Sequence, residues 1–200
     1  DDMLTTTIMA CKCPKLISPA MNTNMFTNPI VQDNLKKLEH YGYEIIQPDS
    51  GYLACGDTGA GKMPSEQVLL NYILRTIAKD KDMAGIKLTV TAGPTREKLD
   101  PVRFLSNNST GKMGYAIARM AMLRGADVTL ISGKVSLEPV PFVKMVDIVS
   151  AEDMYNAVIE SAKDADIIIK AAAVADYRPS NVSDEKIKKK DGDMSIPLER

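Results

Sequence analysis

The chain has few of the residues that build metal centres and disulfide frameworks. It contains three cysteines, Cys11, Cys13 and Cys55, and one histidine, His40. An odd number of cysteines, two of them only two positions apart, argues against a structural disulfide framework. The chain also lacks the CxxC pair that is typical of a zinc site. We therefore expect a protein of the reducing cytoplasm without a Cys/His metal centre.

Long apolar runs and a charge excess are also missing. No apolar stretch approaches the roughly 18 residues of a membrane span, and the first two residues, both Asp, lack the basic start of a signal peptide. The 25 basic and 26 acidic residues nearly cancel, so the chain carries no polyanion-binding signature. We expect a soluble chain that binds neither membrane nor nucleic acid.

The first part of the chain reads as alternating strands and helices that end at a charged joint. The expected elements are strands at 15–18 and 43–47, a helix opened by Asn28 as N-cap and Pro29 and closed by Gly42, and a helix over 65–78. Residues 79–85 are charged and end in glycine, which suits an interdomain joint. The sequence predicts a domain boundary near residue 82.

Beyond the joint, strands and helices alternate again. The expected elements are strands at 87–92, 127–132, 143–148 and 166–173, helices at 113–124 and 151–165, and a possible strand at 194–198. This alternation predicts a parallel, Rossmann-like sheet. The first connection, from Gly93 to Lys112, is far longer than the usual median of about 4 to 6 residues, which is typical of a binding loop.

Residues 106–114 form one of two glycine-punctuated loops that carry chemistry. They lead into the first helix of the second part, where free backbone N–H groups and the helix dipole favour an anion such as phosphate. A plain surface loop with a Ser/Thr N-cap explains them equally well. The segment matches neither a P-loop nor G-x-G-x-x-G, and the second strand, ending at Ser132, has no acidic residue for an NAD ribose.

Two further features gather after the last predicted strand. Asp176 follows the strand at 166–173, at the edge where open α/β sheets bind ligands, and its carboxylate suits a metal ion that bridges phosphates or a ribose. An ordinary turn residue is the alternative. Lys186 and Lys188 alternate about Ile187, as a short strand would present them, although such a run is usually just solvated.

The other loop, residues 51–63, places Cys55 among four glycines. A thiol on such a loop is more accessible than a buried structural cysteine, which makes catalysis an option without establishing it. Two chemically dense loops on either side of a joint predict two active sites.

Together these segments resemble the bacterial bifunctional phosphopantothenoylcysteine decarboxylase / phosphopantothenate-cysteine ligase family of coenzyme A biosynthesis. The decarboxylase motifs are PAMNTNMF at 19–26 and GYLACGDTGAGKM at 51–63. The ligase motifs are TAGPTRE at 91–97, LDPVRFLSN at 99–107, STGKMG at 109–114, AAAVADYR at 171–178 and KIKK at 186–189. The resemblance implies the C-terminal part of a flavodoxin-like flavoprotein domain over residues 1–81 and a Rossmann-like ligase domain over residues 82–200, incomplete at its C-terminus.

For the first domain the resemblance implies FMN-dependent decarboxylation of 4′-phosphopantothenoylcysteine to 4′-phosphopantetheine. Asn22 would hold the substrate carboxylate, Met21 and Asn22 would lie at the cofactor, and Cys55 would supply a proton in the reductive step. The family's active-site histidine belongs to a segment before residue 1, and His40 matches no such motif. We therefore expect an excised piece without decarboxylase activity of its own.

For the second domain the resemblance implies ligation of 4′-phosphopantothenate with cysteine through an acyl-cytidylate made from CTP. Lys186 would serve the first half-reaction, and Asn107, Arg103 and Ala172 the second. The expected nucleotide contacts are Ser109, Gly111, Asp176, Lys186 and Lys188, with Mg²⁺ held at Asp176. Family members assemble as ligase dimers, with the decarboxylase domains in trimers or dodecamers, which implies a homo-oligomer.

Two other functions fit single features of the sequence. An NADP-dependent Rossmann-like reductase would use Lys134 or Arg124 near a 2′-phosphate, and a noncatalytic nucleotide-binding module would need only the loop at 106–114. Each of these functions explains one loop, whereas the ligase explains several motifs in the order in which the family has them. CTP and ATP are not distinguished by the sequence.

Overall fold

The chain divides into two compact units, Asp1–Ala78 and Lys79–Arg200, in a computed structural model that describes residues 2–54, 56–189 and 192–200. They are called unit 1 and unit 2 below. Within the described ranges, no helix is both long and apolar enough to cross a membrane.

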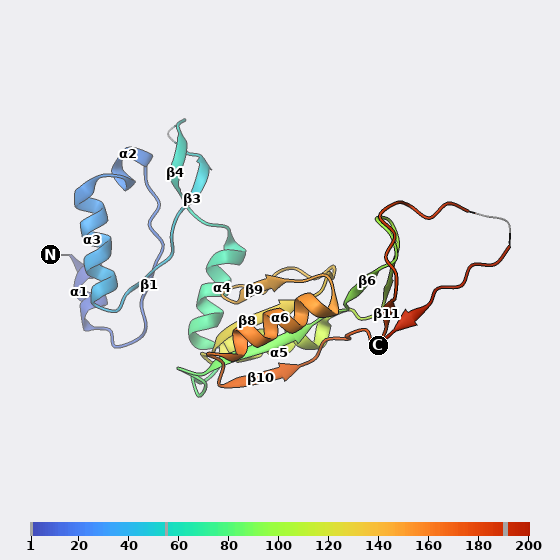
Figure 1. The fold of residues 1–200 in the computed structure, drawn as a ribbon. Coiled ribbons are helices and arrows are strands. Elements are labelled where there is room, and N and C mark those ends of the chain that lie inside the picture. The colour runs from blue at the N-terminus through green and yellow to red at the C-terminus, as the bar shows by residue number, and fades with distance from the viewer. Residues whose placement is uncertain (1, 55, 190–191) are drawn as a thin grey trace. The chain divides into compact units, whose positions relative to one another are not determined.

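In the described residues of unit 1 there are four helices and two small pairs of strands, coloured blue to cyan in Figure 1. Its elements are α1 (Met3–Ala10), β1 (Leu16–Ile17), α2 (Thr23–Phe26), α3 (Pro29–His40), β2 (Glu44–Ile45), β3 (Asp49–Tyr52), β4 (Thr58–Lys62) and α4 (Glu66–Ile77). The predicted boundaries of α3 are confirmed: the Asn28 side chain accepts from the Ile30 N–H at 2.9 Å, Pro29 opens the helix, and Gly42 follows it with φ 84°.

The composition of the glycine-rich segment at 51–63 indicates an irregular loop. In the structure, the segment instead forms much of the antiparallel hairpin β3–β4. Glycine is required where this hairpin meets the loop before α2. A Cβ on Gly61, which has φ 126°, would lie 2.1 Å from the carbonyl oxygen of Met21, and one on Gly59 would lie 2.4 Å from Thr23 Oγ1. The glycines therefore serve close packing as well as turning.

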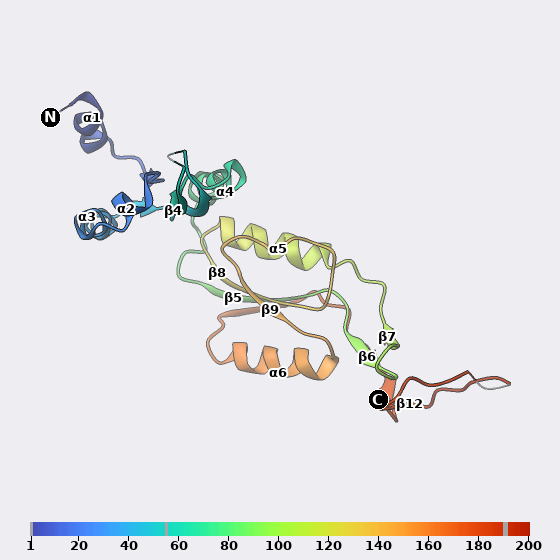
Figure 2. The same cartoon turned by 90° about the horizontal axis from the view of Figure 1, so that it is seen from above.

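Unit 2 is built on a four-stranded parallel sheet in the order β10-β5-β8-β9, with helices on both faces. Its strands are β5 (Lys87–Ala92), β8 (Asp127–Ser132), β9 (Lys144–Asp147) and β10 (Ile167–Lys170), and α5 (Lys112–Leu123) and α6 (Ala151–Ala162) cover opposite faces (Figure 2). Side chains of β5, β8 and α5 form the core, including the fully buried Val90, Leu130 and Ala118. The predicted Rossmann-like parallel sheet is confirmed.

Three sequence expectations for unit 2 need correction. The long first connection contains a second hairpin, β6 (Arg96–Lys98) and β7 (Phe104–Ser106), that projects from one end of the sheet (Figure 1). Strand β10 ends at Lys170, although the segment after it still pairs with the chain that leaves β5: the Ala171 N–H donates to the Thr91 carbonyl and the Ala173 N–H to the Gly93 carbonyl. The strand expected at 194–198 is reduced to β12 (Leu198–Glu199), paired with β11 (Arg178–Pro179).

Gly133, just after β8, lies against the chain that leaves β5. A Cβ at this position would lie 1.8 Å from the carbonyl oxygen of Pro94. Because both backbones are held by the sheet, we expect Gly133→Ala to destabilise unit 2 by about 3 kcal/mol. Gly85→Ala is the matched control: its φ is 82° but no atom lies within 4 Å, so it should cost only about 1 kcal/mol. Urea unfolding of both variants tests this, and equal losses would contradict it.

Candidate active site

The carboxyl ends of β5 and β10 hold the strand-end segment 171–175 in place through buried hydroxyls. Thr91 Oγ1 accepts from the N–H groups of Ala171 and Ala172, both at 3.2 Å. Thr95, which is 0% exposed, accepts at Oγ1 from the Ala175 N–H at 2.9 Å. Two threonines thus add side-chain hydrogen bonds to the backbone bonds that continue past β10, from the Ala171 N–H to the Thr91 carbonyl and from the Ala173 N–H to the Gly93 carbonyl. The result is a fixed backbone at the switch point between neighbouring strands, where open α/β sheets bind ligands.

Asn107 completes this edge. It follows β7, and its amide Nδ2 donates to the carbonyl oxygens of Ala173 at 3.2 Å and Val174 at 3.3 Å. The structure therefore brings Asn107 beside the segment that contains Ala172, two residues that the sequence interpretation had grouped together. The Asn107 side chain is exposed, so it is accessible to a ligand at this edge.

The N-terminus of α5, which begins a few residues after Asn107, is suited to binding an anion. Gly111 is its N-cap, with φ 73° and no side-chain cap, so a Ser/Thr N-cap is not what the structure shows. The Ser109 hydroxyl instead accepts from the Gly111 N–H at 3.4 Å. A Cβ on Gly111 would lie 3.4 Å from the Gly93 backbone nitrogen. Glycine therefore leaves the first turn of α5 bare, which is the arrangement that phosphate sites use.

Asp176 lines a recess of about 550 Å³ at the start of α6. Glu97, 6% exposed, lies in the same recess and accepts from the Ala151 N–H at 2.9 Å. No group of three or more His, Cys, Asp and Glu that could hold a metal occurs in the described part of the chain. A divalent ion fits here only with oxygens from a phosphate and water, as is usual for Mg²⁺.

The tip of hairpin β6–β7 holds the lysine-rich segment at 186–189. The Asp100 carboxylate accepts from Arg103 Nε at 2.9 Å and from the Ile187 N–H at 3.1 Å. Ile187 is half-buried while Lys186 and Lys188 are exposed, so the predicted alternation is present, although no strand forms there. Burial would raise the pKa of Asp100, but hydrogen bonds from Val102, Ile187 and Arg103 outweigh burial and lower that pKa to about 2.

The proposed site residues of unit 2 therefore do not form one cluster: Ser109 and Gly111 lie at the start of α5, Asp176 lies in the recess at the start of α6, and the others form two further groups. Asn107 and Ala172 lie at the sheet edge, whereas Arg103, Lys186 and Lys188 lie at the hairpin tip. Arg103 and Asn107 are four positions apart in extended chain, a span of about 13 Å. Sequence reasoning missed two buried acids: Glu97, which holds the start of α6 beside Asp176, and Asp100, which organises the hairpin tip. Asp100 precedes a proline after β6, and that Asp-Pro turn pattern was the available signal.

In unit 1 the Asn22 loop packs against hairpin β3–β4. Asn22 caps α2 by accepting from the Asn24 N–H at 2.8 Å, and its Nδ2 donates to Asp57 Oδ2 at 3.0 Å. The Met21 N–H donates to the Gly61 carbonyl at 2.9 Å. Cys55 lies outside the described residues. His40 is in the last turn of α3, exposed and edge-on to the Tyr41 ring, and is far in sequence from this loop.

These segments of unit 1 enclose a recess of about 420 Å³. It is lined by Ala20, Met21, Asn22, Tyr52, Leu53, Ala54, Gly61, Lys62 and Met63. Apolar side chains make up much of this lining, together with Asn22, Tyr52 and Lys62, and such a recess suits one edge of a planar ring system such as a flavin.

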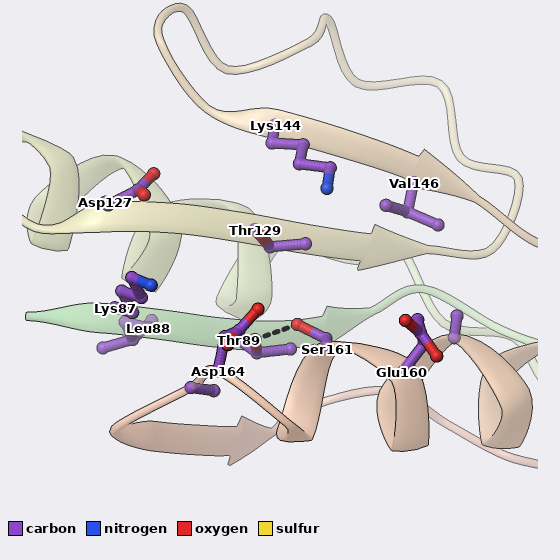
Figure 3. Close-up of a pocket in the computed structure, with 12 residues that line it drawn as sticks. Lys87, Leu88, Thr89, Asp127, Thr129, Lys144, Val146, Glu160, Ser161 and Asp164 are labelled. Atoms are coloured by element: carbon purple, nitrogen blue, oxygen red, sulfur yellow. Dashed lines mark hydrogen bonds between the residues drawn. The ribbon is translucent and has the colours of Figure 1, made fainter.

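A separate hollow of about 340 Å³ lies at the amino ends of the strands of unit 2, beneath α6 (Figure 3). Thr89 and Ser161 in its lining are hydrogen-bonded through their hydroxyl oxygens at 2.5 Å, and Lys87, Asp127 and Lys144 also line it. Its position at the edge opposite the carboxyl ends sets it apart from the groups above.

Two family models together cover most of the chain. Residues 83–200 match the DNA/pantothenate metabolism flavoprotein C-terminal domain, and residues 1–78 match the flavoprotein model. The chain is 46% identical over 203 residues to the coenzyme A biosynthesis bifunctional protein CoaBC of Bacillus subtilis (strain 168), with 100% of this chain and 50% of that protein covered. The protein of the same name from Haemophilus influenzae is 43% identical, with 99% and 50% covered.

Solved structures agree with these matches. A crystal structure of the C-terminal domain of a coenzyme A biosynthesis bifunctional protein CoaBC is 48% identical, with a TM-score of 0.52, over 61% of this chain and 56% of that chain. The chain spans about half the length of the curated relatives it matches. The chain belongs to the DNA/pantothenate metabolism flavoprotein family, and over its whole length it is related to bifunctional proteins of coenzyme A biosynthesis.

Proposed function

We propose that unit 2 belongs to a phosphopantothenate-cysteine ligase that uses CTP. The carboxylate of 4′-phosphopantothenate attacks the α-phosphorus of CTP, and pyrophosphate leaves. The amine of cysteine then attacks the acyl carbon, CMP leaves, and the amine loses a proton as the amide bond forms. The proposal includes a domain boundary near residue 82. The decarboxylase part lies before this residue and the ligase part after it.

The bare N-terminus of α5 beside the Asn107 edge carries the proposal. It offers N–H groups and a positive dipole end to the triphosphate, where Ser109 and Gly111 lie. Asp176 is suited to the ribose or to the Mg²⁺ that accompanies the triphosphate. The amide of Asn107, fixed on two carbonyls, orients the acyl group with Ala172 for attack by cysteine.

Lys186 and Lys188 neutralise charge that builds up on the phosphates during the first half-reaction. Their separation from the Asn107 edge along the hairpin favours a site shared between two copies of the chain, with the hairpin tip of one copy serving the sheet edge of the other. A homodimer in the cytoplasm is therefore part of the proposal. Its substrates are 4′-phosphopantothenate, cysteine and CTP.

We propose that unit 1 contributes to decarboxylation of 4′-phosphopantothenoylcysteine. FMN, when bound, exchanges electrons with the cysteinyl end of this substrate. Of the residues in this chain, Asn22 binds the substrate carboxylate, Met21 lines the recess, and Cys55 donates a proton. The family relationship and the apolar recess beside Asn22 support this assignment.

Calorimetric titration of the chain with CTP and Mg²⁺ tests the ligase proposal. We expect binding of CTP, weaker binding of ATP, and no binding of NADPH. Saturable NADPH binding without CTP binding would support the reductase instead. CTP binding with no pyrophosphate release would support a noncatalytic module. Release is measured in a chimera, defined as the Bacillus subtilis relative with its matched region replaced by this chain.

Asn22→Asp tests the proposed site in unit 1. It would place a carboxylate 3.0 Å from that of Asp57, where like charges repel. We expect decarboxylation by the chimera to fall by at least roughly tenfold, because the loop shifts and the substrate carboxylate is repelled. The matched control is Asn24→Asp, which changes a side chain with no role in the proposal. Equal rates for the two variants would contradict the assignment of Asn22.

A further inference from the structure

The tip of hairpin β6–β7 contains a buried carboxylate that the reaction steps above do not use. The side chain of Asp100 is 0% exposed, and a buried charge of this kind requires several hydrogen-bond partners. Its Oδ1 accepts from the N–H groups of Val102 at 2.8 Å and Arg103 at 2.7 Å. With the Leu99 N–H donating to the Arg103 carbonyl at 2.9 Å, this oxygen closes the hairpin turn.

The other oxygen, Oδ2, connects the turn to a distant part of the chain. It accepts from Arg103 Nε at 2.9 Å and from the Ile187 N–H at 3.1 Å. Arg103 in turn donates from Nη2 to the Ile187 carbonyl oxygen. Both backbone polar groups of Ile187 are thus held by one ion pair. A further tether lies four residues earlier, where the Ser183 N–H donates to the Leu99 carbonyl at 3.0 Å.

Holding Ile187 determines where its two neighbours point. Ile187 is half-buried against the tip, and Lys186 and Lys188 are exposed on either side of it. Neither lysine belongs to a helix or strand, so sheet or helix hydrogen bonds do not order them. A flexible lysine loses conformational entropy when it binds a phosphate, and a fixed backbone reduces that cost.

We propose that Asp100 is a positioning residue that holds the Lys186–Lys188 segment, through Oδ2 and Ile187, in the orientation in which both ammonium groups meet the triphosphate. This inference rests on the proposed ligase function and deepens it. It also gives Arg103 a second task. Its guanidinium holds the nucleotide-binding segment, so replacing Arg103 affects the first half-reaction as well as the second.

Asp100→Asn tests the hydrogen bonds that Oδ2 accepts, because it replaces that oxygen with an amide nitrogen. The amide Oδ1 of Asn still accepts from Val102 and Arg103, whereas its Nδ2 faces two donors, Arg103 Nε and the Ile187 N–H. We expect hydrogen exchange of the Ile187 amide in the 200-residue chain to rise at least roughly tenfold. Exchange of the Val102 and Arg103 amides should change little. Unchanged protection at Ile187 would overturn the proposal.

A double-mutant cycle separates positioning from a general loss of structure. We expect Asp100→Asn to weaken CTP binding by roughly tenfold in the chain, and to have no further effect once Lys186→Gln and Lys188→Gln are present. Equal loss in both backgrounds would overturn the proposal. Asp82→Asn, which breaks an exposed ion pair with Arg124, is the control and should leave CTP affinity unchanged.

Hydrogen exchange at Ile187 and CTP affinity test the two proposals separately. A chain that binds no CTP would refute the ligase function, yet exchange of the Ile187 amide would still show whether Asp100 holds the lysine segment. A chain that binds CTP normally after Asp100→Asn, with Ile187 released, would retain the ligase function and refute the positioning role.

Discussion

Replacing Lys186 with Gln is expected to lower acyl-cytidylate formation in the chimera by at least about 100-fold. The side chain is exposed beside an anchored backbone, and Gln keeps its approximate length while removing the charge. A cation that meets developing phosphate charge in a preorganised site contributes several kcal/mol to the transition state. Release of labelled pyrophosphate in the absence of cysteine measures this step alone.

Lys163→Gln is the matched control for that experiment. Lys163 is the C-cap of α6, with an exposed side chain paired to Glu160, and its loss should leave the rate within a factor of about two. A Lys186→Gln chimera that forms the intermediate at the normal rate would remove Lys186 from the first half-reaction.

Replacing Asn107 with Asp is expected to impair the other half-reaction, so that acyl-cytidylate accumulates. The amide now donates to the carbonyls of Ala173 and Val174, and a carboxylate in its place would face two acceptors. It would move from that edge and bring negative charge to where the tetrahedral intermediate becomes an oxyanion. We expect amide formation to slow by about 100-fold or more, with pyrophosphate release in the first turnover nearly unchanged.

Asn108→Asp provides the comparison, because it adds the same charge at the next position, on an exposed side chain. Quenched single-turnover samples with labelled CTP would show the intermediate rise and persist in Asn107→Asp and decay normally in Asn108→Asp. Loss of pyrophosphate release in Asn107→Asp would place Asn107 in the first half-reaction instead.

Elements with a strong local signal were predictable from the sequence. Asn28, Pro29 and Gly42 delimit α3 as expected, and β5 and β8 have the predicted bounds. The helix depends on capping chemistry, and the two strands depend on a short run of β-branched and apolar residues, signals that act within a few residues. The motif residues Asn107 and Ala172 were grouped by resemblance to a family, and the structure places Asn107 beside the segment that contains Ala172.

Elements that depend on distant partners were not predictable. Hairpin β3–β4 is rich in glycine and lacks polar/apolar alternation, and its register with the Asn22 loop comes from close packing at Gly59 and Gly61. Hairpin β6–β7 read as a loop because each strand has only three residues. Asp100 was missed as an organising residue, since its partner Ile187 lies 87 positions away.

The location of bound CTP tests the central claim most directly. A crystal structure of the chain with CTP and Mg²⁺ is predicted to show the triphosphate at the first turn of α5, near Ser109 and Gly111, with the ribose or the metal ion at Asp176. CTP bound elsewhere, for example in the hollow around Thr89 and Ser161, or an α5 terminus that stays empty at saturating CTP, would contradict the account.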